Sequence, residues 1–240
     1  MKRRIEAVLF DLDDTLHDDT SVYQDAAEEV AREIAVERGI DAVALKAAYV
    51  AEAEGFWHRL DPGDLKETMA GVRRRLWGSA LGRLGIGDDA LAVRSAQRYH
   101  DSRRKRYALF PETLAVLAAE RDRGRKLGLV TNGFSETHRE KLELLRLGDL
   151  FDAVFIADEV GMVKPDPLLF AHACRTLETS PAHSAMVGDR YDRDISGAIE
   201  AGLATVWLNL RGEPLPAGSR PPDAECSTIQ DAGRILQAYP

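Results

Sequence analysis

The chain has 240 residues, of which 45% are hydrophobic, so it can form one large domain or a core domain with a smaller insert. Acidic residues number 40 against 32 lysines and arginines, and the net charge of −8 argues against nucleic acid as the main partner. A local cationic site or a metal would still allow an anionic small substrate to bind.

Cys174 and Cys226 are too few for a disulfide framework, and neither lies in a metal-ligand pattern such as CxxC. The basic start, Met1 to Arg4, is followed by an apolar stretch too short for a signal peptide, and no window reaches the length of a membrane span. We therefore expect a reduced, cytoplasmic protein with no membrane partner.

The first predicted strand ends in a cluster of carboxylates. Residues 5–9 form a short apolar run, which is typical of a strand buried in a parallel sheet. Asp11, Asp13 and Asp14 follow directly, with Thr15 beside them. Because buried carboxylates repel one another unless a cation or hydrogen bonds offset their charge, the cluster predicts a metal site.

The next part of the chain is predicted to be helical, without a strand. Apolar residues recur at three- and four-residue spacing in four segments, 24–37, 41–57, 65–84 and 88–107. Breaks rich in glycine or proline separate these segments. Four helices joined by short turns favour a small bundle.

From Phe110 onward the pattern alternates between helix and strand. The predicted helices are 111–123, 135–147, 167–177 and 195–201, with a closing helix within 227–238. The predicted strands are 126–131, 153–156, 185–188 and 204–208. We expect Ser135 to cap the second of these helices, and residues 211–222, rich in proline and glycine, to form a surface loop.

This alternation predicts an α/β fold, a Rossmann-like parallel sheet with right-handed crossovers. The long helical segment then interrupts the sheet between its first and second strands and must fold as its own unit. We expect a core domain made of residues 1–18 and 108–240, and an inserted helical cap domain of residues 19–107.

Polar residues follow three of the predicted strands. Asp11 and Asp13 follow the first, Thr131 and Asn132 end the second, and Asp189 ends the run 185–188. In open α/β sheets, ligands bind outside the carboxyl ends of the strands. If these strands are neighbours, their ends converge on one crevice.

Lys164 lies in a turn between apolar and helical segments. Pro165 and Pro167 restrict the backbone around it and would aim its side chain. A lysine in a turn is usually only solvated, but these two prolines favour a functional role for Lys164.

These segments together resemble the haloacid dehalogenase (HAD) superfamily. The matching motifs, in order, are Asp11-Leu12-Asp13-Asp14-Thr15 (DxDxT), Thr131-Asn132-Gly133, Lys164-Pro165, and Gly188-Asp189 with Asp194 (GDxxxxD). The resemblance covers the core from Ile5 to Leu208. It implies a HAD-like core and, because Asp13 is present, a phosphatase that acts through an aspartyl-phosphate rather than a dehalogenase.

The resemblance also implies a role for each motif residue. Asp11 would be the nucleophile, with Thr131 and the backbone N–H of Asn132 binding the phosphoryl group and Lys164 neutralising it. Mg²⁺ would be held by Asp11, by the main-chain carbonyl of Asp13 and by Asp189.

The remaining roles belong to Asp13 and to residues around the site. Asp13 would be the acid and base, and its acidic neighbours favour a raised pKa. Thr15 and Asp194 would support the loops, and Arg190 replaces the serine often found beside the metal ligand.

The helical insert resembles the type 1 cap of this superfamily. Within it, Trp57, His58 and Arg59 could face the substrate, although we expect Trp57 to lie in the core. Most residues of the basic runs 73–75 and 103–106 should be solvated or paired, since adjacent helical residues point in different directions. The core motifs resemble those of pyrimidine nucleotidases, acylneuraminate phosphatases and phosphoglycolate phosphatases. The implied substrate is a small phosphorylated metabolite, bound by a monomer or homodimer.

Three alternatives remain open at this point. A phosphomutase would use the same aspartates but return the phosphoryl group to a sugar. A 2-haloacid dehalogenase would release halide, and Asp13 argues against it. A phosphate-binding module without catalysis would not need Asp11, Asp13, Lys164 and Asp189 together.

Overall fold

The computed structural model describes residues 3–240, which form two compact units. One unit runs from the start of the described residues to Asp18 and resumes at Ala108–Pro240, and the other is Asp19–Tyr107. Within residues 3–240, no helix combines the length and apolar character needed to cross a membrane.

The first unit is built on a parallel sheet, as predicted, and this sheet has six strands. Its strands are β1 (Ala7–Phe10), β2 (Lys126–Thr131), β3 (Ala153–Ile156), β4 (Ser184–Gly188), β5 (Ala204–Leu208) and β6 (Ala224–Cys226). They are ordered β3-β2-β1-β4-β5-β6. The first strand therefore has β2 on one side and β4 on the other, with Phe10 aligned with Leu129 and Val187.

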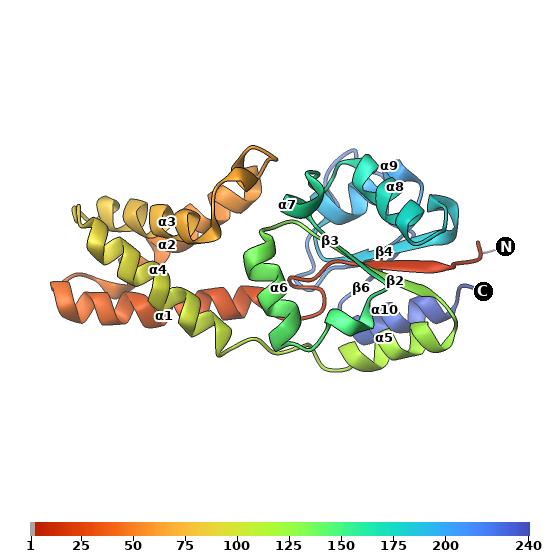
Figure 1. Cartoon of the computed structure of the whole chain (residues 1–240), viewed down its shortest axis with the longest axis horizontal. Helices are drawn as coiled ribbons and strands as arrows, with labels where there is room; N and C mark the ends of the chain where they lie inside the picture. The colour runs from red at the N-terminus through yellow and green to blue at the C-terminus, as the bar shows by residue number, and fades with distance from the viewer. Residues whose placement is uncertain (1–2) are drawn as a thin grey trace. The chain divides into compact units, whose positions relative to one another are not determined.

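Helices cover both faces of this sheet (Figure 1). They are α5 (Thr113–Asp122), α6 (Ser135–Leu144), α7 (Ala157–Val160), α8 (Pro167–Thr176), α9 (Ser196–Ala201) and α10 (Ile229–Gln237). In Figure 1, α8 and α9 lie over one face, and α5 and α10 over the other. The central strands, including all of β1, are completely buried, as their continuous apolar sequence predicts.

The sequence predicted five of the six strands, and missed β6. This strand has only three residues and pairs with β5 at the edge of the sheet, where Cys226 aligns with Leu208. Its sequence, Ala-Glu-Cys, has no apolar run, so the pairing is decided by the neighbouring strand and not by local preference.

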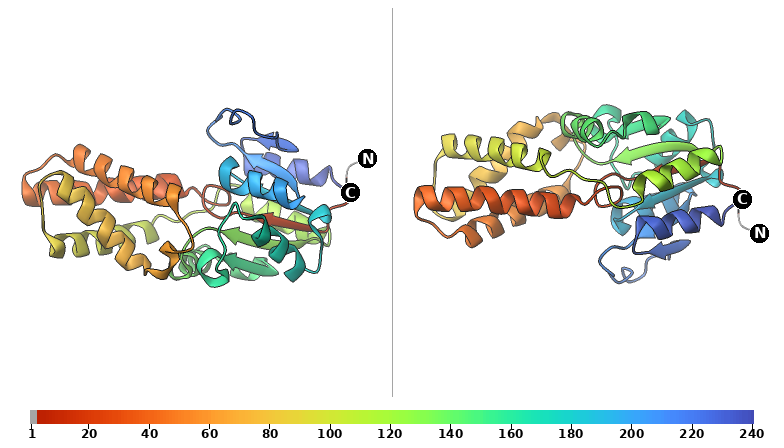
Figure 2. Two further views of the ribbon diagram at one scale, coloured as in Figure 1. Left: turned by 90° about the horizontal axis from the view of Figure 1, so that it is seen from above. Right: turned by 90° about the horizontal axis from the view of Figure 1, so that it is seen from below.

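The second unit has four α-helices, α1 (Asp19–Arg38), α2 (Ala42–Arg59), α3 (Met69–Arg83) and α4 (Asp89–Arg104), with a short 3₁₀ helix (Asp64–Lys66) between α2 and α3. They pack side by side in both views of Figure 2. Asp41, Thr68 and Asp88 each accept a hydrogen bond from a first-turn N–H and so begin α2, α3 and α4. Within residues 19–107, all of which the structure describes, there is no strand.

The core of this bundle is aromatic. Tyr49 stacks on Trp77 with ring centroids 4.1 Å apart, and Tyr99 packs edge-on against both rings. The expectation for Trp57 was wrong, because this residue is only half-buried and its neighbour Phe56 occupies the core.

The basic runs follow the expectation in part. Arg74 forms two hydrogen bonds of 2.8 Å with Asp89. Arg73 and Arg103, however, are buried, and Arg103 pairs with Asp19 at 2.5 Å. Helical geometry thus separates adjacent arginines into buried and exposed sets, a division that the run itself does not predict.

Candidate active site

The carboxyl ends of β1, β2 and β4 lie next to one another at the same end of the sheet, because these strands are parallel neighbours. Asp11 follows β1, Thr131 ends β2, and Asp189 follows β4. The structure therefore brings together motif residues that lie between 58 and 178 positions apart in the sequence. The strand order reverses between β1 and β4, and ligands usually bind at the carboxyl ends of the strands at such a point.

The loop after β1 is shaped by its own residues. Leu12 and Leu16 are completely buried, and the Leu16 N–H donates to the Leu12 carbonyl at 2.9 Å. Asp14 has a φ of 57°, in the left-handed region that aspartate tolerates better than most residues. This tight turn exposes the side chains of Asp11 and Asp13 to different surroundings.

Asp11 is held by a buried ammonium. The Nζ of Lys164 lies 2.5 Å from Asp11 Oδ1 and 2.6 Å from Asp194 Oδ1, and Lys164 is only 2% exposed. Thr15 donates its hydroxyl to Asp11 Oδ2 at 3.4 Å. One positive charge is therefore shared between two buried carboxylates.

The backbone of Lys164 is clamped by two side chains. Asn132 Oδ1 accepts from the Lys164 N–H at 2.7 Å, and Asn132 Nδ2 donates to the Lys164 carbonyl at 2.9 Å. Arg193 Nη1 donates to the same carbonyl at 2.9 Å. The position of the lysine thus depends on the turn after β2 and on the segment after β4.

Asp194 belongs to a π-helical turn, Tyr191–Ile195, which follows β4. It is completely buried, and its Oδ2 accepts from the Arg190 N–H at 3.0 Å. A side chain at Gly188 would place its Cβ 2.4 Å from Asp194 Oδ2, so only glycine fits here. π-helical turns occur often at functional sites.

The carboxylates of Asp11, Asp189 and Asp194 form an acidic cluster, with one oxygen of each within 4.8 Å of the others. Burial raises the pKa of Asp11 to about 7, with Lys164 opposing the shift and Asp194 and Asp13 adding to it. Burial, followed by the charges of Asp194 and Asp11, raises the pKa of Asp189 well above its usual value. An all-oxygen site with such repulsion fits a hard divalent cation.

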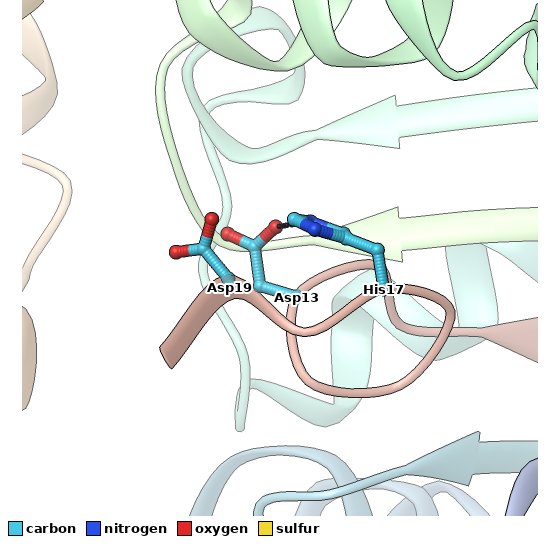
Figure 3. Close-up of side chains that lie close together, drawn as sticks. All are labelled: Asp13, His17 and Asp19. Atoms are coloured by element: carbon cyan, nitrogen blue, oxygen red, sulfur yellow. Dashed lines mark hydrogen bonds and ion pairs between the residues drawn. The ribbon is translucent and has the colours of Figure 1, made fainter. Parts of the chain in front are cut away.

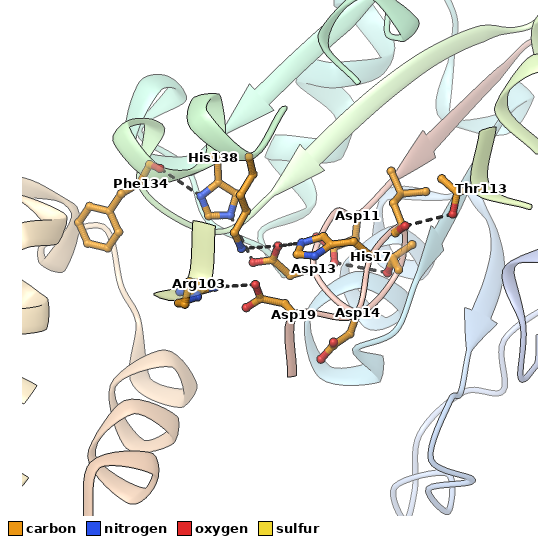
Figure 4. A network of polar contacts seen from close by, with 12 residues as sticks. Asp11, Asp13, Asp14, His17, Asp19, Arg103, Thr113, Phe134 and His138 are labelled. Atoms are coloured by element: carbon orange, nitrogen blue, oxygen red, sulfur yellow. Dashed lines mark hydrogen bonds and ion pairs between the residues drawn. The ribbon is translucent and has the colours of Figure 1, made fainter. Parts of the chain in front are cut away.

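Asp13 has surroundings of the opposite kind. Its Oδ1 accepts from Lys141 Nζ at 2.7 Å and contacts His17 Nε2 at 2.8 Å. His138 Nε2 lies 3.5 Å from Oδ2. Figure 3 shows the imidazole of His17 directed at the Asp13 carboxylate, and Figure 4 shows His138 near the same group.

These contacts overturn the expected raised pKa of Asp13. Burial does raise the pKa, but Lys141 and the hydrogen bonds of His138 and His17 outweigh it, so the pKa of Asp13 lies well below 3.8. Along the chain, Asp11 and Asp14 are the acidic neighbours of Asp13, and by themselves they would raise its pKa. The basic groups that decide the result come mainly from α6, which is far away along the chain.

The expected cap of α6 was also wrong. Phe134 is the N-cap residue, and Ser135 instead donates through its N–H and its hydroxyl to Asp158 Oδ2, at 2.7 and 2.8 Å. The carboxylate that accepts these hydrogen bonds at the start of α6 belongs to Asp158. Asp158 lies in α7, a helix of four residues that the sequence did not predict.

Lys141, His138 and Arg193 belong to the site but were not predicted from the sequence. Helical spacing carries a signal for the first two, because His138 and Lys141 lie three residues apart and so share one face of α6. Arg193 had no such signal, since only its contact with the Lys164 carbonyl distinguishes it from a solvated arginine.

Known proteins resemble the chain over almost its whole length. A family model described as haloacid dehalogenase-like hydrolase matches residues 5–202. The chain belongs to this family. It is therefore a hydrolase whose fold, motifs and acidic cluster agree with the expectation drawn from the motifs.

Two curated relatives of this HAD hydrolase are phosphatases. A phosphoserine phosphatase of Thermus thermophilus is 34% identical, with 98% of each chain covered. The N-acylneuraminate-9-phosphatase of Mus musculus is 30% identical, over 98% of this chain and 95% of the mouse protein. The crystal structure of the HAD-hydrolase YfnB from Bacillus subtilis, bound to magnesium, matches with a TM-score of 0.76 and 26% identity, covering 98% and 99% of the two chains.

Proposed function

We propose that the protein is a magnesium-dependent phosphatase that hydrolyses a small phosphomonoester through an aspartyl-phosphate on Asp11. One observation carries this proposal: Asp11 directly follows β1, with the Lys164 ammonium on one carboxylate oxygen and Asp189 close by. A phosphate dianion needs both a cation and an ammonium to approach a carboxylate. The phosphatase names of the relatives support the same reaction.

The donor set supports Mg²⁺ as the metal. Asp194 already binds Lys164 and the Arg190 N–H, which leaves Asp11 and Asp189 as the carboxylates that would hold the ion. The main-chain carbonyl of Asp13 would be the third protein ligand, and Mg²⁺ usually keeps several waters besides. When bound, the ion would supply charge neutralisation for the carboxylates and the phosphoryl oxygens.

The residues of the chain then divide the reaction between them. Asp11 attacks phosphorus, while Lys164 neutralises phosphoryl oxygens. The Thr131 hydroxyl and the Asn132 N–H bind the transferring group at the end of β2. Thr15 and Asp194 support the loop and the lysine.

Asp13 acts as acid and then as base. It gives a proton to the leaving oxygen, and afterwards takes one from the water that hydrolyses the aspartyl-phosphate. Since its pKa is low in the free protein, Asp13 must take up this proton as the phosphate binds, when the nearby negative charge favours the neutral acid.

Residues 19–107 serve as the cap domain of this enzyme, and the substrate is a nucleotide, a sugar phosphate or a compound of the phosphoglycolate class. Relatives named for phosphoserine and for an acylneuraminate phosphate support a small, polar leaving group. A phosphomutase is the second candidate on the same scaffold, because it would use the same aspartates.

An aryl phosphate assay tests the proposal. The wild-type protein should release phosphate with Mg²⁺ and lose this activity with EDTA. Asp13→Asn should bind a phosphate analogue normally but turn over on the order of 10²-fold more slowly or worse. Near-normal turnover would rule out the acid and base role, and a sugar bisphosphate in place of free phosphate would favour the mutase.

A further inference from the structure

Asp13 has two different carboxylate oxygens. Among residues 3–240, Lys141 at 2.7 Å and His17 at 2.8 Å both contact Oδ1, whereas the basic group next to Oδ2 is the ring of His138 at 3.5 Å. Protonation is disfavoured at a carboxyl oxygen that accepts a hydrogen bond from an ammonium. Oδ2 is therefore the oxygen left to carry one.

Lys141 is an unusual residue to find in this position. It is 1% exposed and lies on α6, which is not part of any of the four motifs. Burial of an ammonium is unfavourable unless an anion compensates its charge. The Asp13 carboxylate provides that compensation, so the contact fixes both side chains.

The turn after β2 places α6 for this contact. The Phe134 carbonyl accepts from His138 Nδ1 at 3.1 Å, which fixes the ring at the start of the helix (Figure 4). A Cβ at Gly133 would lie 2.0 Å from the His138 ring, so the turn and the helix are in close contact. Asp158 holds the first turn through Ser135.

We propose that Lys141 is a positioning residue for proton transfer, which together with His17 holds Oδ1 of Asp13 so that Oδ2 carries the proton given to the leaving group. This inference rests on the proposed phosphatase function. It goes beyond the motif residues, because Lys141 acts on the acid through a helix outside them.

The step concerned is the first half of the reaction. A bond forms between Asp11 and phosphorus, the bond from phosphorus to the leaving oxygen breaks with its electron pair on that oxygen, and the Asp13 proton moves to the same oxygen. Asp13 is left as a carboxylate. Donors on Oδ1 are complementary to that product and keep the carboxyl plane fixed while Oδ2 reacts.

The dependence of kcat/KM on the leaving group tests this role of Lys141. Phenyl phosphate has a poor leaving group that needs the proton, whereas 2,4-dinitrophenyl phosphate has a good one that does not. For Lys141→Met, kcat/KM should fall at least about tenfold more with phenyl phosphate than with the dinitrophenyl ester. Because both substrates are measured on one preparation, this ratio does not depend on how much of the variant is folded.

Arg139→Met is the matched control. Arg139 lies on the same helix, is half exposed and pairs with Glu159, so its loss should leave the ratio unchanged. Asp13→Asn should shift the ratio in the same direction as Lys141→Met. The double variant should show no further shift, because Lys141 acts only through Asp13.

The outcomes separate the two proposals. An equal loss on both substrates in Lys141→Met, or no loss, would overturn the positioning role while the phosphatase remains. A double variant with fully additive shifts would overturn it as well. A wild-type protein that hydrolyses neither ester with Mg²⁺ would overturn the proposed function and this inference with it.

Discussion

Asp11 and Asp13 are two residues apart in the chain, yet their surroundings are opposite. Asp11 faces the carboxylates of Asp189 and Asp194, and its pKa is raised to about 7. Asp13 is surrounded by one lysine and two histidines, and its pKa is lowered. The tight turn between them therefore separates a nucleophile in a cluster of carboxylates, which shares one ammonium with Asp194, from an acid surrounded by basic groups.

The largest effect should come from the nucleophile. Asp11→Asn removes the attacking oxygen, so we expect turnover of an aryl phosphate to fall on the order of 10⁴-fold or more. A phosphorylated protein, detectable in the wild type by mass spectrometry after acid quench, should be absent. Residual activity within tenfold of wild type would contradict attack by Asp11.

Removal of the shared ammonium should have the next largest effect. Lys164→Met leaves Asp11 and Asp194 buried without their cation, so the free energy of unfolding should fall by about 3–5 kcal/mol. Urea denaturation without metal measures this change. Lys141→Met should cost less, because Asp13 keeps His17 and is partly exposed. An equal loss in both variants would remove the distinction between the two sides of the loop.

The acidic side of the site, which is the cluster of Asp11, Asp189 and Asp194, should also make stability depend on pH. A carboxyl whose folded pKa is raised from 3.8 to about 7 binds more protons in the folded state, so without metal the melting temperature should fall as pH rises through that range. Asp189 acts in the same direction. The lowered pKa of Asp13 contributes stability that is lost only below this range.

Added Mg²⁺ should therefore raise the melting temperature more at pH 7.5 than at pH 5, by a few degrees for each kcal/mol gained. Calorimetry at the two pH values, with Mg²⁺ or EDTA, measures this difference. A stabilisation that is equal at both values would mean that the ion does not bind the acidic cluster.

The two sides also differ in how far the sequence predicts them. The acidic side lies within motifs that each follow a predicted strand, so strand ends and the rule for parallel sheets were enough to bring Asp11 and Asp189 together. The basic side of the site consists of Lys141, His138 and His17 around Asp13. Its arrangement depends on which face of α6 contacts the loop after β1. Residue spacing puts His138 and Lys141 on one face, but it does not say what that face contacts.

The same limit applies to the positions of the supporting residues. Asn132 was expected to act through its backbone N–H, and its side chain turns out to clamp Lys164. The strand β6 and the short α7 were missed, since neither has a periodic pattern of its own. Contacts with other segments of the chain decided these features, and local preference did not.

Gly133→Ala should produce a smaller effect that sharpens the comparison. The added Cβ would lie 2.0 Å from the His138 ring and must displace it, on the Asp13 side alone. Since a shift of about 1 Å can cost up to 10²-fold in rate, we expect kcat to fall roughly tenfold. Binding of Mg²⁺ at the Asp11 side, measured by calorimetry, should not change. A loss of metal affinity would show that the two sides are coupled.

The smallest effect should come from Arg190. Its guanidinium forms two hydrogen bonds with Asp192, and both side chains are more than 40% exposed, so the pair adds less than about 1 kcal/mol. The Arg190 group that matters to the site is its N–H, which donates to Asp194 and is kept by any residue other than proline. Arg190→Ser should therefore leave kcat/KM and the apparent Mg²⁺ affinity within about twofold of wild type. A larger change in metal affinity would mean that the Arg190 side chain itself alters Mg²⁺ binding at the acidic cluster. The arginine found in place of serine would then have a chemical role in this protein.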